Sequence, residues 1–315
     1  MQETRHRVLD ALANGPVSGP TLAEQLDISR SAIWKHVEAL RDEGFEIESG
    51  DDGYVLDSVP EFGEAAVEYG LDAPFSVEYH DSIPSTNARA RDLAAEGASD
   101  VVVLADEQTG GRGRLDREWS SPSGGIWLSA LFRPDVPMAH APVFTLAAAV
   151  AVTRAAREAG VDAGIKWPND VLVRRGDEER KLVGILTEME GEADRVSWVV
   201  VGIGINANVD PEDLPGDARP TSLQAERGDP VDRRAFTQRV LEEFDALRRD
   251  PDGVLDAWRE YATTLGRRVR VETPSRTVEG EAVDVQFPGA LVVETGTGTE
   301  VVSAGDCEHL RPLSE

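Results

Sequence analysis

Cysteine is nearly missing from this chain, since Cys307 is the single one among 315 residues. One cysteine cannot form an internal disulfide, and the five histidines are scattered without the spacing of zinc ligands. The sequence therefore argues against thiol chemistry and metal-dependent hydrolysis. No apolar run approaches the length of a membrane span, and the N-terminus lacks the apolar stretch of a signal peptide. We therefore expect a cytoplasmic protein with no membrane association.

Lysine is also scarce, and basic residues as a whole are outnumbered. Lys35, Lys166 and Lys181 are the only lysines, and 32 basic residues face 59 acidic ones, which gives a net charge of −27. The acidic residues are spread along the chain instead of forming a tail. We favour a halophile-like acidic surface, adapted to a cytoplasm in which salt screens the self-repulsion. An ordinary acidic protein that its charge keeps soluble is the alternative.

The first 57 residues have the pattern of a winged helix-turn-helix. The expected elements are short amphipathic helices over residues 5–13, over residues 18–25 and after Ser29, and a hairpin wing over residues 46–56. In the third helix, apolar side chains at i, i+4 and i+7 form one inward face, made of Ile33, Val37 and Leu40.

The outer face of that third helix is a candidate DNA-reading surface, because a recognition helix enters the major groove. Its side chains are Ser29, Arg30, Ser31, Trp34 and Lys35. The segment is acidic, with five Lys or Arg against twelve Asp or Glu, so counterion release would contribute little to affinity. We still expect DNA binding, because recognition needs only a few well-placed groups. A small helical packing module is the alternative.

The remainder has the pattern of an α+β protein. Residues 58–74 are expected to form a linker, residues 75–262 a mixed-sheet domain and residues 266–315 a small β-barrel. Strands of the central domain are expected over residues 75–80, 101–105, 126–132, 182–190 and 195–203, and helices over residues 85–96, 143–159 and 233–247. Strands of the C-terminal domain are expected over residues 268–272, 278–286, 291–294 and 300–303.

Residues 108–119 alternate glycine with arginine, in the order Gln-Thr-Gly-Gly-Arg-Gly-Arg-Leu-Asp-Arg-Glu-Trp. Glycine lets a backbone approach a ligand closely, and the planar fork of arginine pairs with carboxylate and phosphate oxygens. The glycine spacing fits neither a P-loop nor a dinucleotide fingerprint. The pattern predicts a loop that holds two anionic groups together, with a mobile, solvated Arg/Gly loop as the alternative.

Four more motifs accompany this Arg/Gly loop. They are Asp-Ser-Ile-Pro-Ser-Thr-Asn at 81–87, Lys-Trp-Pro-Asn-Asp at 166–170, Arg-Lys-Leu-Val-Gly-Ile-Leu at 180–186 and Val-Gly-Ile-Gly-Ile-Asn at 201–206. In this order and spacing, the five motifs resemble the catalytic core of biotin protein ligases. The N-terminal segment resembles the helix-turn-helix of the biotin operon repressor type, and the resemblance makes the C-terminal barrel SH3-like.

The resemblance implies ATP-dependent biotinylation of a carrier-domain lysine through biotinyl-5′-AMP, with repression of biotin genes. The substrates would be biotin and ATP with Mg²⁺, and the partners a biotin carboxyl carrier protein domain and operator DNA, bound by an adenylate-loaded homodimer. A biotin-sensing regulator without ligase activity is one alternative, although a sensor would not need charges that stabilise an acyl-phosphate. A lipoate ligase or octanoyltransferase is another, which the Arg/Gly loop and Lys-Trp-Pro-Asn-Asp disfavour.

The resemblance also assigns residues to the site. The biotin contacts would be Ser85, Thr86, Asn87, Gln108, Arg112, Gly113, Arg114, Lys181, Gly184 and Gly202. The ATP and adenylate contacts would be Gly111, Trp119, Asn169, Asp170 and Asn206, with Asp170 also meeting the magnesium ion. Arg112, Arg114 and Lys181 would be catalytic, because positive charge must offset the repulsion when a carboxylate attacks an α-phosphate.

Simpler structural roles stay open for several of these residues. Ser85 suits a helix N-cap, and Trp119 suits a plain core position. Asn169 and Asp170 suit a turn, and the glycines in the strands suit β-bulges.

Overall fold

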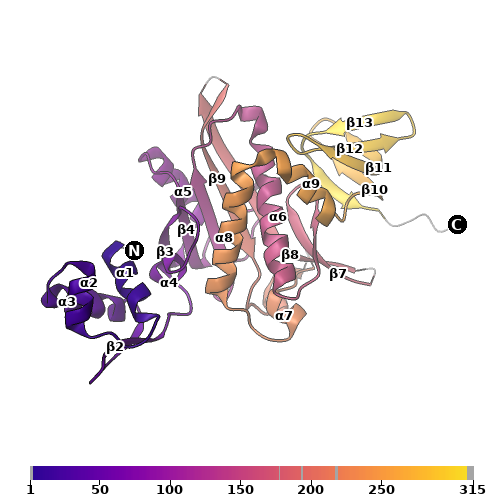
Figure 1. Ribbon diagram of the computed structural model, residues 1–315. Helices are drawn as coiled ribbons and strands as arrows, with labels where there is room; N and C mark the ends of the chain where they lie inside the picture. Colours follow the sequence, from indigo (N-terminus) through magenta and orange to yellow (C-terminus); the bar gives the residue numbers. More distant parts are fainter. Residues whose placement is uncertain (1–2, 177, 193, 217–218, 311–315) are drawn as a thin grey trace. The chain divides into compact units, whose positions relative to one another are not determined.

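The computed structural model describes residues 3–176, 178–192, 194–216 and 219–310. The chain divides between Asp72 and Ala73 into two compact units. The first unit contains the winged-helix pattern, and the second contains a mixed sheet followed by a smaller antiparallel sheet (Figure 1). The α+β class predicted from the sequence is therefore confirmed.

The first unit is built from three helices and a hairpin, followed by one short helix. They are α1 (Glu3–Leu12), α2 (Gly19–Leu26), α3 (Arg30–Asp42), β1 (Glu46–Gly50), β2 (Gly53–Ser58) and α4 (Glu64–Glu68). Ser29 caps α3, because its hydroxyl accepts from Ala32 N at 3.2 Å. The predicted inward face of α3 is confirmed, since Ile33, Val37 and Leu40 are fully buried.

The segment expected to be a linker belongs to this first unit up to Asp72. Ala65 of α4 is 8% exposed and joins the apolar core of the unit. Val59 and Tyr69 pack against the same core. A five-residue helix is too short to show a helical period, so the sequence pattern did not reveal this packing.

A seven-stranded sheet forms the centre of the second unit, in the order β3-β4-β5-β9-β8-β7-β6. The strands are β3 (Ser76–Ile83), β4 (Val101–Gln108), β5 (Ile126–Phe132), β6 (Ala163–Lys166), β7 (Asp170–Arg175), β8 (Glu178–Glu192) and β9 (Arg195–Ile205). Only β3 and β4 are parallel, so the predicted mixed sheet is confirmed. The short strands β6 and β7 were not expected.

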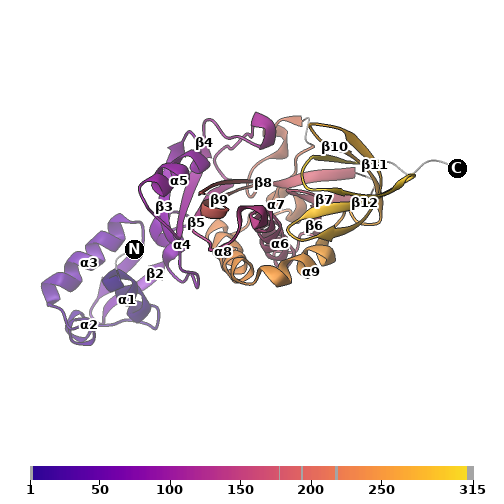
Figure 2. The same cartoon turned by 90° about the horizontal axis from the view of Figure 1, so that it is seen from above.

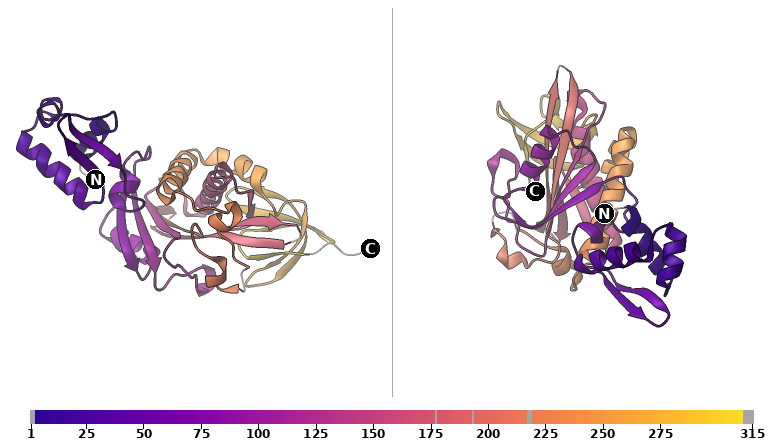
Figure 3. Two further views of the ribbon diagram at one scale, coloured as in Figure 1. Left: turned by 90° about the horizontal axis from the view of Figure 1, so that it is seen from below. Right: turned by 90° about the vertical axis from the view of Figure 1, so that its left-hand side faces the viewer.

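Three helices cover one face of this sheet: α6 (Pro142–Glu158), α8 (Arg233–Arg249) and α9 (Pro251–Tyr261) (Figure 3, left). Phe132 of β5 meets Phe144 and Phe244 edge to face, with ring centroids 4.9 and 5.7 Å apart. The stretch Met138–Glu158 is long and apolar enough to cross a membrane, which the sequence analysis did not anticipate. Because 67% of its most apolar window is buried within the unit, it has the character of a core helix.

The opposite face of the sheet carries α5 (Thr86–Ala95) and the Arg/Gly loop with its short 3₁₀ helix η1 (Arg114–Asp116). Thr187 of β8 bonds to Thr145 of α6 at 2.7 Å, which places Thr187 on the helix-covered face. Side chains alternate along a strand, so Leu186 and Glu188 point to the other face. That other face is where the cavity lies.

Five antiparallel strands form the SH3-like C-terminal domain, in the order β13-β12-β11-β10-β14. They are β10 (Arg267–Glu272), β11 (Thr277–Gln286), β12 (Ala290–Thr295), β13 (Gly298–Val302) and β14 (Asp306–His309), of which β14 was not expected. This sheet lies beside β7 and β8 (Figures 1 and 2). The remaining described elements are η2 (Met138–His140), η3 (Pro211–Asp213) and α7 (Leu223–Arg227).

Candidate active site

A cavity opens on the sheet face that carries α5. Strands β5, β8 and β9 contribute to its floor, while α5, the Arg/Gly loop, β7 and the C-terminal domain contribute to its walls. It is lined by thirteen of the residues expected at the site: Ser85, Thr86, Asn87, Gln108, Arg112, Gly113, Arg114, Trp119, Asn169, Asp170, Lys181, Gly184 and Gly202. The cavity has a neutral end and a charged end.

The neutral end is a network of hydroxyl and amide groups around the start of α5. Ser85 Oγ accepts from Ala88 N at 3.3 Å, which is the N-cap that the sequence left open. Gln108 Oε1 accepts from Thr86 N at 2.8 Å, and Gln108 Nε2 donates to Ser121 Oγ at 3.0 Å. These bonds fix the direction in which the Gln108 amide faces.

Asn87 is the hub of the neutral end. Its Nδ2 donates to Glu188 Oε2 at 2.7 Å and to Leu186 O at 3.3 Å, while Ser129 Oγ lies 2.6 Å from its Oδ1. A Cβ atom at Gly202 would lie 2.1 Å from that Oδ1, so only glycine fits beneath it. Asn87 is 9% exposed and Ser129 is fully buried. The hydrogen-bond partners of Asn87 are therefore supplied by the protein itself.

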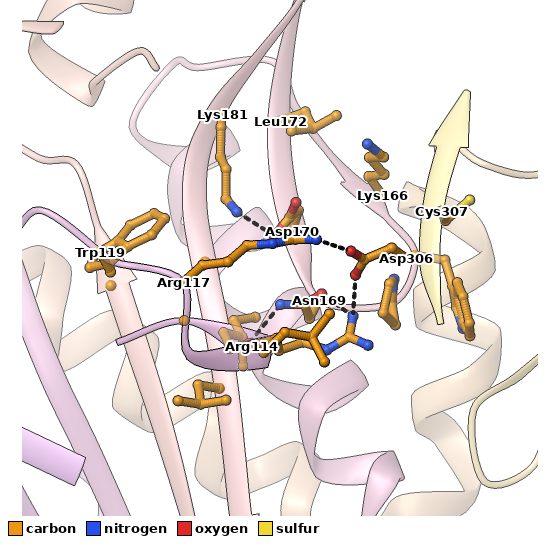
Figure 4. Close-up of a pocket in the computed structure, with 18 of the residues that line it drawn as sticks. Arg114, Arg117, Trp119, Lys166, Asn169, Asp170, Leu172, Lys181, Asp306 and Cys307 are labelled. Atoms are coloured by element: carbon orange, nitrogen blue, oxygen red, sulfur yellow. Dashed lines mark hydrogen bonds and ion pairs between the residues drawn. The ribbon is translucent and has the colours of Figure 1, made fainter. Parts of the chain in front are cut away.

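At the charged end, Lys181 of β8 lies between a carboxylate and an aromatic ring (Figure 4). Its Nζ is 2.9 Å from Asp170 Oδ1 and 5.1 Å from the centre of the Trp119 ring. The side chains of Lys181 and Asp170 are both 22% exposed, so a ligand can reach them.

The Trp119 ring rests on a floor of two glycines. A Cβ atom at Gly184 would lie 2.9 Å from the ring, and one at Gly204 would lie 2.5 Å from Nε1. Gly184 of β8 and Gly204 of β9 are register partners, so the floor crosses two strands. Trp119 Nε1 is buried and has no hydrogen-bond partner among the described residues. The ring also packs against the apolar cluster around Trp127, so it combines a core position with a place in the cavity lining.

The Arg/Gly loop is tied to the C-terminal domain (Figure 4). Arg114 Nη1 donates to Asn169 Oδ1 at 3.0 Å, and Nη2 donates to Gly305 O at 3.1 Å. Asp306 Oδ1 lies 3.9 Å from Arg114, and its Oδ2 pairs with Arg117. Two loop arginines are thus held by acceptors of the protein itself. Arg112 is exposed, and among the described residues its side chain bonds only to the backbone oxygen of Asp116 in its own loop.

A second cluster joins β8 to the C-terminal domain at the cavity wall. Glu179 lies 3.0 Å from His309 Nδ1 and also pairs with Arg267, while His309 Nε2 lies 2.9 Å from Thr264 Oγ1. Burial alone would raise the pKa of Glu179, but the hydrogen bond and charge of His309, followed by those of Arg267, lower it to about 2. Glu179 therefore stays ionised at neutral pH and fixes this junction.

Two expected ligand contacts lie outside the cavity lining. Asn206 is 2% exposed, and its Nδ2 donates to Thr221 O at 2.9 Å, so it anchors the loop after β9. A Cβ atom at Gly111 would lie 2.4 Å from Trp119 O, so Gly111 is needed where the two arms of the Arg/Gly loop touch. Neither residue lines the cavity, and both support the segments that do.

Cys307 lines the cavity wall without reactive character. Burial raises the pKa of its thiol to about 12, so the thiolate is not populated near neutral pH.

Several residues of the site had no role assigned from the sequence: Arg117, Ser129, Glu188, Gly204 and Asp306. Gly204 had a visible signal, because it is the second glycine of Val-Gly-Ile-Gly-Ile-Asn. Arg117 also had one, because it belongs to the Arg/Gly loop at 108–119. Ser129, Glu188 and Asp306 reach the site through strand pairing and loop contacts between segments that are distant in sequence, and such contacts leave no local pattern.

In the first unit, the candidate DNA-reading surface is open to solvent. All five side chains predicted for it, Ser29, Arg30, Ser31, Trp34 and Lys35, are exposed, and Trp34 is 55% exposed. Single exposed apolar side chains are ordinary on a protein surface, so this exposure shows only that the face is accessible.

The chain matches three family sequence profiles. The HTH domain covers residues 4–55, the biotin/lipoate A/B protein ligase family covers 79–206, and the biotin protein ligase C terminal domain covers 264–310. The bifunctional ligase/repressor BirA of Bacillus subtilis is 39% identical over 309 residues, which cover 93% of each chain. The chain belongs to the biotin protein ligase family.

Other members of this family align over shorter stretches. A biotin–[acetyl-CoA-carboxylase] ligase of Mycobacterium tuberculosis is 39% identical over 241 residues, 72% of this chain and 86% of its own length. The biotin protein ligase of Aquifex aeolicus in complex with biotin and ATP has a TM-score of 0.63 at 25% identity, covering 75% of this chain and 99% of that one. The family predicted from the five motifs and the helix-turn-helix is thus confirmed.

Proposed function

We propose that this protein joins biotin to a lysine of a biotin carboxyl carrier protein domain, and represses biotin genes through its first unit. The observation that carries the proposal is a single cavity with a neutral, hydrogen-bonding end and a cationic end beside an aromatic ring. Biotin has a neutral ureido head and a carboxylate tail, and an adenylate continues with phosphate and adenine. The cavity offers matching groups in that order, and membership of the ligase family supports the assignment.

The first chemical step needs positive charge, because the biotin carboxylate must attack the α-phosphate of ATP. The repulsion of two such anions at ~4 Å is about 4 kcal/mol at an effective dielectric of 20. We assign Lys181, Arg112 and Arg114 to offset it, since all three line the charged end. Pyrophosphate leaves as the mixed anhydride forms. The carrier lysine then attacks the anhydride carbonyl and releases AMP, so no covalent enzyme intermediate is required.

The neutral end would take the ureido head. Ser85, Thr86, Asn87 and Gln108 present hydroxyl and amide groups that both donate and accept, as a ureido group requires. Gly184 and Gly202 leave space for Trp119 and Asn87, which would contact the ligand, and Gly113 would let the backbone of the Arg/Gly loop approach it.

The nucleotide would lie toward Trp119, Asn169 and Asp170. The exposed part of the Trp119 ring offers a stacking surface for adenine. One oxygen of Asp170 is paired with Lys181, so the carboxylate is at most a single ligand for magnesium. Phosphate oxygens of ATP would supply most of the remaining coordination, as Mg²⁺ commonly has in nucleotide sites.

We propose that repression uses a homodimer loaded with the adenylate, since two-fold operators are read by dimers. The recognition surface would be Ser29, Arg30, Ser31, Trp34 and Lys35. The net charge of −27 suits a salt-rich cytoplasm. Salt there would screen the repulsion between the acidic protein and its anionic ligands, which are DNA and ATP.

The first experiment incubates the purified protein with biotin, Mg-ATP and a biotin carrier domain, in low and in molar salt. Pyrophosphate release and biotin transfer are followed together, with carrier lacking its acceptor lysine as the control. Release with transfer establishes the ligase. Release without transfer would indicate a sensor that forms the adenylate, and no release in either salt would refute the catalytic assignment.

A further inference from the structure

We propose that Thr221 and Glu226 are positioning residues for Lys181, because they hold an irregularity in the backbone of β8 that turns this lysine into the cavity. The inference rests on the proposed function and deepens it, since Lys181 is one of the cations assigned there to the attack on the α-phosphate. Neither Thr221 nor Glu226 lines the cavity. Both would therefore act on the reaction only through Lys181.

Lys181 faces the cavity at a place where a regular strand would turn it away. Gly184 lies beneath the Trp119 ring, and a Cβ atom there would be 2.9 Å from the ring. Lys181 Nζ lies 5.1 Å from the centre of the same ring, so both residues are on the cavity face (Figure 4). They are three positions apart, and side chains an odd number of positions apart point to opposite faces of a regular strand. A regular β8 would therefore direct Lys181 to the opposite face of the sheet.

Leu182 is the source of the irregularity. In the pairing of β8 with β7, Lys181 lies opposite Leu172. Val183 lies opposite Val171, the residue next to Leu172, so Leu182 is an extra residue with no register partner in β7. Such an extra residue is a β-bulge, and it reverses the alternation of side chains beyond it. The bulge thus brings Lys181 to the cavity.

The segment after β9 holds this bulge in the way that a neighbouring strand would. The register pairs of β8 with β9 do not extend to the bulge. Instead, Lys181 N donates to Arg219 O and Lys181 O accepts from Thr221 N, each at 2.9 Å. Leu182 O accepts from Asn206 N at 3.1 Å. These bonds satisfy backbone groups that the bulge would otherwise leave unpaired.

Thr221 is itself fixed by further partners. Its O accepts from Asn206 Nδ2 at 2.9 Å, and its hydroxyl donates to Glu226 Oε1 at 2.5 Å. Thr221 is 1% exposed, so it is shielded from water. Without the carboxylate, the hydroxyl hydrogen would be buried and unpaired, which costs more than an ordinary hydrogen bond gains. We expect Thr221 to shift in that case, and the backbone of Lys181 to shift with it.

Glu226 also ties this segment to β7, the other neighbour of the bulge. Its Oε2 accepts from Nε of Arg175, a residue of β7, at 2.9 Å. The side chain of Glu226 is 7% exposed and that of Arg175 is 51% exposed, so the carboxylate depends on its internal partners. The two segments that flank the bulge are therefore joined to one another through Glu226.

The first test measures adenylate formation, as the biotin-dependent exchange of pyrophosphate into ATP, with the full-length protein. Thr221→Val keeps the shape of the side chain but loses the hydroxyl. It should lower kcat by about tenfold with the KM for biotin unchanged, because a small displacement of a catalytic group is costly. Thr221→Ser keeps the hydroxyl and should stay close to wild type. In a Lys181→Ala background, Thr221→Val should cause little further loss, because the side chain that it positions is gone.

The second test needs no activity, because the chain has only three lysines. Brief treatment with acetic anhydride, followed by mass spectrometry, gives the acetylation rate of Lys181 relative to that of the exposed Lys35. In wild type, Lys181 Nζ is shielded by its pair with Asp170 at 2.9 Å and by the adjacent aromatic ring. Thr221→Val should release the side chain and raise this relative rate several-fold, whereas Thr221→Ser should not.

A second variant and a matched control complete the design. Glu226→Gln removes the charge that faces Arg175 and should lower kcat by a smaller factor than Thr221→Val. If Thr221→Val does not fold by circular dichroism, Glu226→Gln is measured in both backgrounds instead. Thr153→Val is the control, because Thr153 is fully buried on α6 and its hydroxyl donates to Ala149 O at 2.7 Å. It should leave both kcat and the acetylation of Lys181 unchanged.

Three results would overturn the inference alone. They are a wild-type kcat in Thr221→Val, an equal loss of kcat from this change with and without Lys181, and an unchanged acetylation rate of Lys181. The second of these would mean that Thr221 acts independently of the lysine. A wild type with no biotin-dependent exchange in any salt would instead remove the proposed function. The acetylation rates would still show whether Thr221 places Lys181, so the two failures are distinguishable.

Discussion

The two ends of the cavity are organised by different physics. At the neutral end, Asn87, Thr86 and Ser129 are nearly or fully buried, and each is held by short hydrogen bonds. At the charged end, Lys181 and Asp170 are partly exposed and pair with one another. A neutral group without a buried partner costs free energy, so that end is built before the ligand arrives. At the charged end, the charged side chains pair with one another and can exchange these partners for a ligand. This suits a site where negative charge develops only during the reaction.

The largest effect is expected from removing the positive charge of Lys181 at the charged end of the cavity. Lys181→Ala should lower the rate of adenylate formation by about 100-fold or more, because no other lysine takes its place beside Trp119 and Asp170. Biotin binding measured by calorimetry should weaken far less, since the neutral end is intact. Arg180→Ala is the control, because this half-buried neighbour pairs with Glu178 and is not among the residues that line the cavity. Near-wild-type turnover of Lys181→Ala would remove this residue from the mechanism.

The cluster of Glu179, His309 and Arg267 differs from the Lys181–Asp170 pair, because its charges stay paired with one another. The lowered pKa of Glu179, about 2 against an ordinary 4.5, means that the folded state binds its proton less readily than the unfolded state. Its stabilisation is therefore complete above pH 4.5 and is lost as the pH falls toward 2. Since the side chain is 21% exposed, we expect about 2 kcal/mol, below the full value of the shift.

Urea unfolding of wild type and Glu179→Gln between pH 3 and pH 7 measures that contribution, reading the difference in free energy of unfolding. The variant should be less stable at pH 6, and the difference should shrink with acid. Glu178→Gln, a neighbouring exposed carboxylate, should show little difference at any pH. A difference that grows toward acid would contradict the assigned direction of the pKa shift.

Gly202 and Gly204 of β9 allow the neutral end and the charged end of the cavity to be disturbed separately. A methyl group at Gly204 would press on Trp119 Nε1 at 2.5 Å, and one at Gly202 would press on Asn87 Oδ1 at 2.1 Å. We expect Gly204→Ala to raise the KM for ATP by about tenfold with little change for biotin, and Gly202→Ala to do the reverse. The two variants are each other's control. Equal effects on both substrates would show that the ends are not separable.

The sequence predicted the centre of the sheet well, because long strands such as β5 and β9 are continuous apolar runs. It missed α9, whose first residues, Pro251-Asp-Gly, have the composition of a turn. Proline is also suited to the first turn of a helix, and Val254, Ala257 and Trp258 then bury one face of α9. Local composition was ambiguous there, and tertiary packing decided between the two readings.

The candidate site shows the same difference between local sequence patterns, which could be predicted, and tertiary contacts, which could not. Residues in contiguous motifs, such as Lys181 and Asp170, were predicted and do lie together. Asp306 was not, since it meets Arg114 and Arg117 across more than 180 positions of sequence, and a single aspartate carries no pattern. Contacts of this kind are decided by how the C-terminal domain docks on β8, which only the folded chain shows.

The smallest expected effect comes from loosening that contact. Asp306→Asn keeps the shape but removes the charge that holds Arg114 and Arg117, so the arginines should turn to ATP more readily. Exposed ion pairs contribute up to about 1 kcal/mol, which limits the decrease in the KM for ATP to a few-fold. The difference in the KM for ATP between the variant and wild type should vanish in molar salt, because screening weakens the ion pairs of Asp306 in wild type as well. Asp256→Asn, in an exposed pair far from the Arg/Gly loop in sequence, should leave the KM unchanged. A rise in the KM on Asp306→Asn would mean that Asp306 places the arginines for the substrate, and the charged end would then be as preformed as the neutral one.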